Sequence, residues 1–204
     1  MTTFYQRRGK RVFDILGATT ALVVTSPLQL GVSAIVRNRM GSPVLFKQQR
    51  PGQYGAPFTL LKFRTMRTFL THADTDKSDA ERLTPFGRWL RSTSLDELPE
   101  FLNVLRGEMS LVGPRPLLMD YLDRYTTEQE RRHDVKPGIT GWAQVNGRNA
   151  LTWDEKFTLD VWYVKHMSFK IDVQILFRTV IQVMKRSGVA AKGYETMPEF
   201  KPKV

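Results

Sequence analysis

The stretch from Ile15 to Val36 constrains this chain most, because its 22 residues include no charged side chain. A straight helix of that length would measure about 33 Å, enough to cross a bilayer core about 30 Å thick. A signal peptide would have a shorter apolar core, and no convincing small-residue cleavage site precedes the charged residues from Arg37 onward. A buried helix of a soluble protein would rarely be so long without a charge. The sequence therefore predicts a helix that associates with a membrane.

Two features favour a re-entrant helix over one that spans the bilayer, although proline kinks also occur in spanning helices. Pro27, near the midpoint, removes a backbone hydrogen bond, and Ser26 can bond back to a carbonyl and help to hold a bend. Each arm would then be about 16 Å long, too short to cross alone. Both flanks are basic, and basic flanks favour the cytoplasmic side, so both ends of the helix are expected there. These flanking residues are Arg7, Arg8, Lys10 and Arg11 before the segment and Arg37, Arg39 and Lys47 after it.

Composition excludes several chemistries. The chain has no cysteine, which rules out disulfides, thiolate metal sites and a cysteine nucleophile. Its three histidines show no metal-ligand spacing, and neither a G-x-S-x-G elbow nor a phosphate-binding P-loop occurs. The formal net charge of +11 indicates an anionic partner. Charge alone does not distinguish nucleic acid, an acidic membrane surface and a phosphorylated substrate.

Beyond the apolar segment, the sequence predicts an α+β fold that is mainly helical, with a small antiparallel β-hairpin. Val44–Gln49 and Phe58–Phe63 are rich in apolar residues, and "PGQYG" between them favours a turn. The polar stretch Thr68–Thr84 predicts a loop. The glycine-rich segment "KPGITGWAQVNGRN" has no helical period and predicts a loop or an irregular strand.

Capping signals predict where the helices start. Each of three capping boxes pairs a serine or threonine with a glutamate three residues later. A further short helix is expected at "TPFGRWLRS". Gly107 is expected to end the helix that starts at the first box. The boxes are Ser94 with Glu97, Thr127 with Glu130, and Thr152 with Glu155.

A last amphipathic helix is expected from about Ile171 to Ser187. Its apolar face, flanked by basic residues, would suit a membrane interface. The same face could instead pack against the protein core, and the sequence supports both interpretations equally.

The octapeptide "SLDELPEF" carries two adjacent acids, Asp96 and Glu97, at one of these predicted helix starts. Acids in a first helical turn often do no more than cap free N–H groups. Basic residues lie nearby in the sequence, and a helix N-terminus itself favours anions. If these groups converge, they form a pocket for a diphosphate, in which one carboxylate could attack phosphorus and the other could hold Mg²⁺. The basic residues are Lys62, Arg64, Arg88, Arg91 and Arg115, the last fixed between two prolines, whereas Arg132 is expected to be solvated in a charged helix.

The ordered motifs of the chain resemble those of the bacterial sugar transferase family, the monotopic phosphoglycosyl transferases. They run from a basic N-terminus through the Ser26-Pro27 break, "PVLFKQQRPG", "FTLLKFRTM" and "LRSTSLDELPEFLNVLRGEMSLVGPRP" to "KPGITGWAQVNGRN". The length of the chain and its "NGRNALTWDEKFTLDVWYVKHMSFKID" segment are most similar to the small single-domain members.

The resemblance implies a reaction and two parts of the chain. Such enzymes transfer a phospho-sugar from a UDP-sugar, here expected to be an N-acetylated amino sugar, to undecaprenyl phosphate and release UMP. It implies residues 1–40 as a re-entrant membrane helix and residues 41–204 as a catalytic domain, on the cytoplasmic face of the bacterial inner membrane. The expected partners are therefore these two substrates and membrane lipids, and not nucleic acid.

The resemblance also implies residue roles. Asp96 would be the nucleophile that forms a covalent phospho-sugar intermediate, and Glu97 would bind Mg²⁺. Arg148 would contact the nucleotide-sugar. The remaining candidates for phosphate or substrate binding are Lys62, Arg64, Arg91, Arg115, Asp160 and Asp172, with no role yet defined for the two aspartates.

Two other functions compete with this interpretation. A non-enzymatic basic protein that binds a membrane surface or nucleic acid would explain the charge and the apolar segment, but it leaves the acid pair without a role, and no nucleic-acid-binding motif occurs. A phosphatase with an aspartyl-phosphate intermediate would use the acid pair, release inorganic phosphate and need no lipid acceptor.

Overall fold

The structure is a computed structural model that describes residues 4–67, 82–147, 150–185 and 199–200. Most of the loop predicted at Thr68–Thr84 lies outside these residues. In the described part, helices predominate around one antiparallel hairpin, as predicted, and a second, parallel pair of short strands accompanies it.

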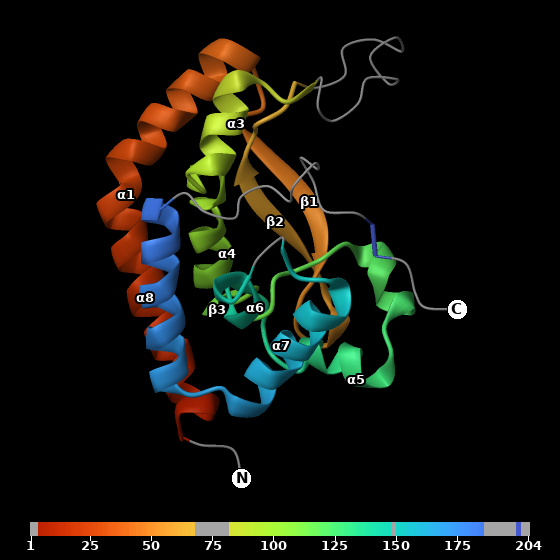
Figure 1. The fold of residues 1–204 in the computed structure, drawn as a ribbon. Coiled ribbons are helices and arrows are strands. Elements are labelled where there is room, and N and C mark those ends of the chain that lie inside the picture. The colour runs from red at the N-terminus through yellow and green to blue at the C-terminus, as the bar shows by residue number, and fades with distance from the viewer. Residues whose placement is uncertain (1–3, 68–81, 148–149, 186–198, 201–204) are drawn as a thin grey trace.

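The apolar segment forms one long helix, α1 (Lys10–Met40), which follows a π-helical turn at Tyr5–Gly9. Helical structure continues through Pro27, and Figure 1 shows the two halves of α1 running in different directions. Proline has no N–H to offer the carbonyl four residues earlier, that of Val23. The Ser26 hydroxyl donates a hydrogen bond to that carbonyl over 2.8 Å, as the sequence predicts. The serine thus supplies the donor that the proline removes.

The outer surface of α1 is largely apolar. The helical segment Tyr5–Met40 is long and apolar enough to cross a membrane by length and composition, and only 11% of its most apolar 18-residue window is buried within the protein. Elsewhere α1 packs on α4 (Glu100–Arg106) and on β3 (Ser110–Val112). One side of α1 therefore packs against the rest of the protein, and the other side is apolar and exposed.

The predicted hairpin is confirmed. Strands β1 (Leu45–Pro51) and β2 (Pro57–Phe63) pair antiparallel, with Arg50 opposite Phe58 and Phe46 opposite Lys62. The segment predicted to be a loop or irregular strand is more ordered than expected. Part of it forms β4 (Gly138–Thr140), which pairs in parallel with β3, and the short helix α6 (Trp142–Val145) follows.

The remaining helices are α3 (Pro85–Ser92), α5 (Thr127–Glu130), α7 (Trp153–His166) and α8 (Phe169–Lys185), with 3₁₀ turns at Leu95–Glu97, Met119–Arg124 and Arg131–His133. Thr152 and Glu155 form the predicted capping box of α7. The box predicted at Thr127 and Glu130 is wrong by one residue, since Thr126 and Gln129 form it.

The capping box predicted at Ser94 and Glu97 is wrong. Ser94 adopts a left-handed conformation with a φ of 57°, and its side chain caps no helix. The chain then makes a 3₁₀ turn, and α4 begins only at Glu100, after Pro99. Gly107, with a φ of 83°, ends α4 as predicted. The acid pair therefore lies in a tight turn between two helices rather than in the first turn of an α-helix.

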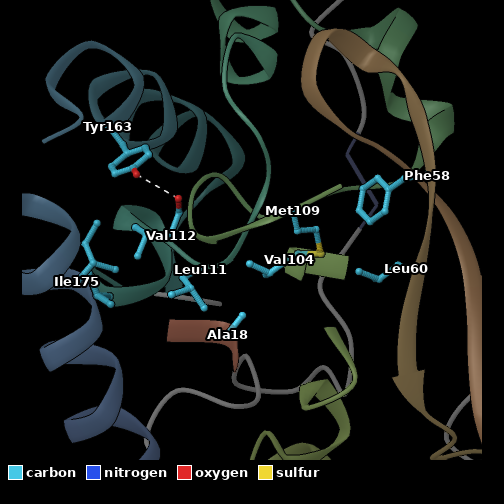
Figure 2. Packing of buried hydrophobic residues seen from close by; sticks show 10 residues of the cluster. Ala18, Phe58, Leu60, Val104, Met109, Leu111, Val112, Tyr163 and Ile175 are labelled. Carbon is cyan, nitrogen blue, oxygen red and sulfur yellow. Dashed lines mark hydrogen bonds between the residues drawn. The ribbon is translucent and has the colours of Figure 1, made fainter. Parts of the chain in front are cut away.

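The main hydrophobic core joins α1, the hairpin, α4, β3, α7 and α8 (Figure 2). Within it the Tyr163 hydroxyl oxygen lies 3.1 Å from the Val112 carbonyl oxygen. One face of α8 buries Ile175 in this core, while a stripe of large apolar side chains on α8 is exposed. The interpretation that this helix packs on the protein core is therefore confirmed for one face, and the interpretation as a membrane-interface helix stays a prediction for the exposed face. The exposed residues are Phe169, Val173, Phe177, Val180 and Met184.

Candidate active site

The acid pair lies where the turn between α3 and α4 meets β2. Asp96 is 7% exposed, and its carboxylate accepts no hydrogen bond from any described residue. Burial raises its pKa, and the adjacent Glu97 raises it further. Positive charges on Lys62, Arg115 and Arg91 oppose this shift and favour the carboxylate form. Asp96 is thus a buried carboxylate that nearby positive charges stabilise. Its two oxygens accept no hydrogen bond from the described residues and are available to react.

Glu97 is held from two sides. Lys62 Nζ and an Arg115 Nη2 each lie 2.6 Å from the same oxygen, Oε1. Burial opposes ionisation of Glu97, but these two cations outweigh it and hold its pKa well below its usual range. In return, Glu97 raises the pKa of Arg115, although the Arg115 side chain is 44% exposed. Neighbouring acids therefore have opposite environments, a pattern typical of catalytic carboxylates.

A third acid, which the sequence did not single out, lies behind the pair. Glu100 is 2% exposed, and its Oε1 lies 3.2 Å from Lys62 Nζ. Burial is the main cause that raises the pKa of Glu100, to about 7. Repulsion from Glu97 raises it further, and attraction to Lys62 opposes both effects. Three carboxylates thus share two cations, and Glu100 is the one for which ionisation is most costly near neutral pH.

Replacing Glu100 with glutamine is expected to raise the free energy of unfolding at pH 8.5, by roughly 1–3 kcal/mol. The folded protein binds this proton more tightly than the unfolded chain, so wild-type stability is greatest below the unfolded pKa and falls as pH rises through about 7. Thermal melts of Glu100→Gln and wild type at pH 5.5 and 8.5 should show the gap widening with pH. Glu130→Gln, at an exposed position, is the control. A gap independent of pH would contradict this assignment.

The carboxylates of the acid pair could supply only some of the ligands that Mg²⁺ needs. The described residues include no group of three or more His, Cys, Asp or Glu side chains arranged to hold a metal. Mg²⁺, however, commonly takes one or two carboxylates and completes its shell with substrate phosphates and water. Both cations on Glu97 contact Oε1, and Oε2 has no partner among the described residues. An ionised carboxylate with one uncommitted oxygen therefore fits a metal that arrives with a diphosphate.

Two further predicted residues differ in their placement. Arg91, near the end of α3, donates through Nε to Thr65 Oγ1 over 3.2 Å and acts electrostatically on Asp96. Gly87 allows α3 to pack directly against the backbone of Thr65, because a Cβ at position 87 would lie 1.9 Å from the Thr65 carbonyl oxygen. Arg64 instead donates to the carbonyls of residues 40–42 at the end of α1, so it secures a helix end rather than the acid pair.

The expectation that Arg132 is solvated is wrong. Arg132 is 2% exposed, and its Nη2 lies 2.8 Å from Asp160 Oδ2 on α7. The same nitrogen donates to the Arg115 backbone carbonyl over 2.7 Å. The Arg132 guanidinium also lies over the rings of Tyr125 and Phe157. Asp160 is thus linked to the acid pair indirectly, through Arg132 and then the main chain of Arg115.

A model of the bacterial sugar transferase family matches residues 5–186, most of the chain. The chain belongs to the bacterial sugar transferase family. This sugar transferase is 54% identical over 191 residues to a Bacillus subtilis protein named uncharacterized sugar transferase EpsL, covering 94% of this chain and 95% of that one. It is 39% identical over 196 residues to undecaprenyl-phosphate galactose phosphotransferase from Salmonella typhimurium, covering 88% of this chain and 41% of that one.

A third relative carries a more explicit name. UDP-glucose:undecaprenyl-phosphate glucose-1-phosphate transferase from Klebsiella pneumoniae is 40% identical over 185 residues, covering 85% of this sugar transferase and 39% of that enzyme. The chain therefore spans about two fifths of the length of the Salmonella and Klebsiella enzymes.

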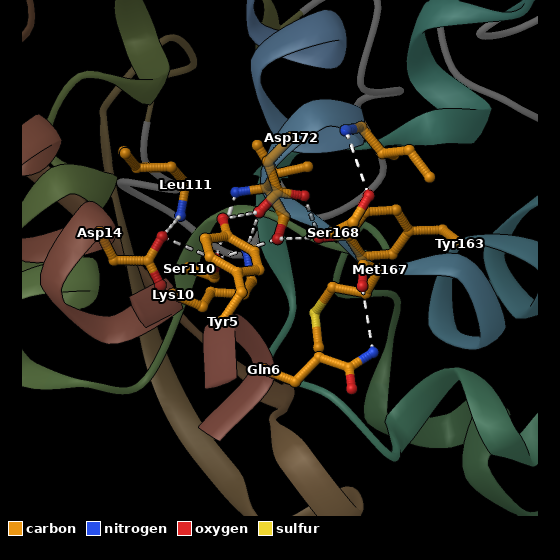
Figure 3. Close-up of polar contacts among 12 residues, drawn as sticks. Tyr5, Gln6, Lys10, Asp14, Ser110, Leu111, Tyr163, Met167, Ser168 and Asp172 are labelled. Atoms are coloured by element: carbon orange, nitrogen blue, oxygen red, sulfur yellow. Dashed lines mark hydrogen bonds and ion pairs between the residues drawn. The ribbon is translucent and has the colours of Figure 1, made fainter. Parts of the chain in front are cut away.

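The structure does not bring Asp172 to the acid pair of this sugar transferase. Asp172 is fully buried between the starts of α1 and α8, in the polar cluster of Figure 3. It accepts hydrogen bonds from Tyr5 (2.5 Å), Lys10 (2.6 Å) and Tyr163 (2.7 Å). Nearby, Asp14 accepts hydrogen bonds from the Ser110 hydroxyl and the Leu111 backbone N–H. This cluster attaches the start of α1 to the rest of the protein. Arg148 lies outside the described residues.

Proposed function

We propose that this protein transfers a sugar 1-phosphate from a UDP-sugar to undecaprenyl phosphate and releases UMP. The observation that carries the proposal is the contrast within the acid pair. Asp96 is buried and accepts no hydrogen bond from the part of the chain that the structure describes, while Glu97 is held by Lys62 and Arg115. A nucleophile needs uncommitted oxygens, and a site for a diphosphate needs concentrated positive charge. The names of the Salmonella and Klebsiella relatives support this substrate class.

The proposed reaction has two displacements at one phosphorus. An Asp96 oxygen attacks the phosphorus that bears the sugar, the bond from that phosphorus to the bridging oxygen breaks, and UMP leaves with the electron pair. This step forms a covalent aspartyl phospho-sugar. A phosphate oxygen of undecaprenyl phosphate then attacks the same phosphorus, which breaks its bond to Asp96. The products are undecaprenyl diphosphate-sugar and a regenerated carboxylate.

The neighbouring side chains have distinct proposed tasks. Arg115 and Lys62 stabilise the charge that develops on the diphosphate, because fixed cations in a partly buried site interact strongly with it. Arg91 acts on Asp96 and favours its ionised, nucleophilic form. Glu97 would hold Mg²⁺ through its free oxygen, and the metal, when bound, would neutralise diphosphate charge.

The test is UMP release by the purified chain from individual UDP-sugars, with undecaprenyl phosphate and with or without Mg²⁺. We expect an N-acetylated amino sugar to be used best, and UDP-galactose and UDP-glucose are the comparisons suggested by the relatives. A phosphatase would release inorganic phosphate without the lipid acceptor. A nucleic-acid-binding protein would release no UMP and would instead bind DNA with steep salt dependence.

The membrane association that we propose has two parts. Helix α1 would enter and leave the cytoplasmic face of the inner membrane as a re-entrant helix, supported by its exposed apolar surface and its bend. Helix α8 would lie in the interface with its apolar stripe towards lipid, because Phe177 and Met184 are 68% and 80% exposed. Undecaprenyl phosphate would then reach the acid pair from the membrane.

Replacing Ser26 with alanine and Pro27 with leucine is expected to convert the re-entrant helix into a spanning one. The change restores the N–H donor for the Val23 carbonyl and removes the ring clash that favours the bend. The native chain has no cysteine, so single cysteines at Thr3 or Ser42 can be labelled with a membrane-impermeant maleimide in intact cells. Both positions should be protected in the native protein, and position 3 should become labelled in the straightened variant.

The control is the same labelling after the cells are permeabilised, when both cysteines should react. Labelling of position 3 from outside in the native protein would mean that the helix spans the membrane, and the re-entrant interpretation would have to be abandoned.

A further inference from the structure

Arg50 is a cation near the acid pair that the proposed reaction does not yet use. It lies on β1, partly buried. Its Nη2 donates to Gln48 Oε1 over 2.6 Å, and its Nη1 lies 3.5 Å from the Pro116 carbonyl oxygen, next to Arg115. Its Nε is buried and has no hydrogen-bond partner among the described residues, and none of their carboxylates forms an ion pair with it. A partly buried cation without a counter-ion is costly unless an anion arrives.

The register of the hairpin places Arg50 in line with the acid pair. Arg50 is opposite Phe58, and Lys62 lies four residues further along β2, so both side chains project from the same face of the hairpin. Their backbones are then about 13 Å apart along the strand. Arg115 connects the two ends of this row, because its guanidinium contacts Glu97, the partner of Lys62, while the following residue contacts Arg50.

Positive charge accumulates at the Arg50 end of this row. Burial lowers the pKa of Arg50, and the nearby Arg115 lowers it further. Burial and Arg115 likewise lower the pKa of Lys156, on α7, to about 8. Both cations are therefore close enough to Arg115 to be repelled by it. Glu100 acts on Arg50, and Asp160 acts on Lys156, in the opposite direction, but each effect is smaller than those of burial and Arg115. The Glu97 and Glu100 carboxylates form their ion pairs with Lys62, at the other end of the row.

We infer that Arg50, together with Arg115, binds the phosphate that leaves with the nucleotide, so that the nucleoside monophosphate lies towards the turn end of the hairpin. This inference rests on the proposed function for the identity of the anion. The lipid acceptor is placed at the other end by an apolar groove of about 440 Å³ between α1 and α3, lined by residues that include Pro27, Phe86 and Trp89. The phospho-sugar would then lie between the two, against Asp96.

The test uses the full-length chain in detergent and three variants. Arg50→Gln removes the charge, Arg50→Lys keeps it without the planar fork, and Lys47→Gln removes an exposed cation from the opposite face of the same strand. The probes are UMP and inorganic pyrophosphate, with binding measured by calorimetry. Arg50→Gln should weaken both by about 10- to 100-fold, the usual effect of losing a hydrogen bond to a charged group. Arg50→Lys should be intermediate, and Lys47→Gln unchanged.

Kinetics and stability separate the alternatives. The KM for the UDP-sugar should rise with Arg50→Gln while that for polyprenyl phosphate stays the same, and the reverse result would assign Arg50 to the acceptor and overturn the inference. Without ligand, Arg50→Gln should melt no lower than wild type, since it removes an unpaired cation. A lower melting temperature with unchanged UMP affinity would make Arg50 structural. If wild type releases no UMP from any UDP-sugar but binds pyrophosphate through Arg50, the proposed function fails and the anion subsite stands.

Discussion

Asp96→Asn is expected to lower the rate of UMP release at least about 1,000-fold, to background. An amide oxygen cannot displace UMP from phosphorus, and the neighbouring carboxylates of Glu97 and Glu100 are already paired with Lys62. Intact-mass measurement after incubation with a UDP-sugar, without acceptor, should show a phospho-sugar adduct on wild type and none on the variant. The exposed Asp123 supplies the matched control, as Asp123→Asn should keep both the adduct and the rate.

Stability separates a chemical role for Asp96 from a structural one. Burial and Glu97 raise the pKa of Asp96, so the ionised side chain destabilises the folded protein, and this cost grows as pH rises above the ordinary pKa of an aspartate. Asp96→Asn removes that cost without changing shape, and the variant should melt no lower than wild type at pH 8. Normal UMP release by this variant would exclude Asp96 as the nucleophile. A large loss of stability would make it a structural residue.

Features with a local signal were predictable from the sequence. The hairpin followed from two apolar runs with a turn between them, and α7 from its capping box. The basic residues around the acid pair were also partly predictable, because Lys62, Arg91 and Arg115 are close to the pair in space as expected.

Features that depend on tertiary contacts were not predictable from the sequence. Ser94 has the side chain of a helix cap, but a φ of 57° turns it away, and no local pattern encodes that angle. Strands β3 and β4 have three residues each, too few to show a period, and each is defined by the other. Arg132 and Asp160 are 28 positions apart, so their pairing has no sequence signature, and a charged neighbourhood made Arg132 look solvated.

The buried ion pair of Arg132 and Asp160 lies next to the main chain of Arg115. Arg115→Ala is expected to lower kcat/KM for the UDP-sugar by about 100- to 1,000-fold, because Arg115 holds Glu97 together with Lys62 and would stabilise the charge that develops on the diphosphate. The Arg132 guanidinium fixes the Arg115 main chain through the 2.7 Å bond to its carbonyl. Arg132 is therefore a positioning residue, which acts through Arg115 and through no contact of its own with the acid pair.

Arg132→Lys tests this relation, since lysine keeps a charge beside Asp160 but loses the fork that reaches both the carboxylate and the carbonyl. In the wild-type background it should lower kcat by about tenfold, whereas in the Arg115→Ala background it should lower kcat no further. Its effect on the melting temperature should be the same in both backgrounds, because the pair with Asp160 is disturbed equally. Arg131→Lys is the matched control, at the adjacent position with a side chain 44% exposed, and it should change neither quantity. If the losses of kcat from Arg115→Ala and Arg132→Lys multiply, Arg132 contributes independently of Arg115, and the connection through the Arg115 carbonyl carries no catalytic effect.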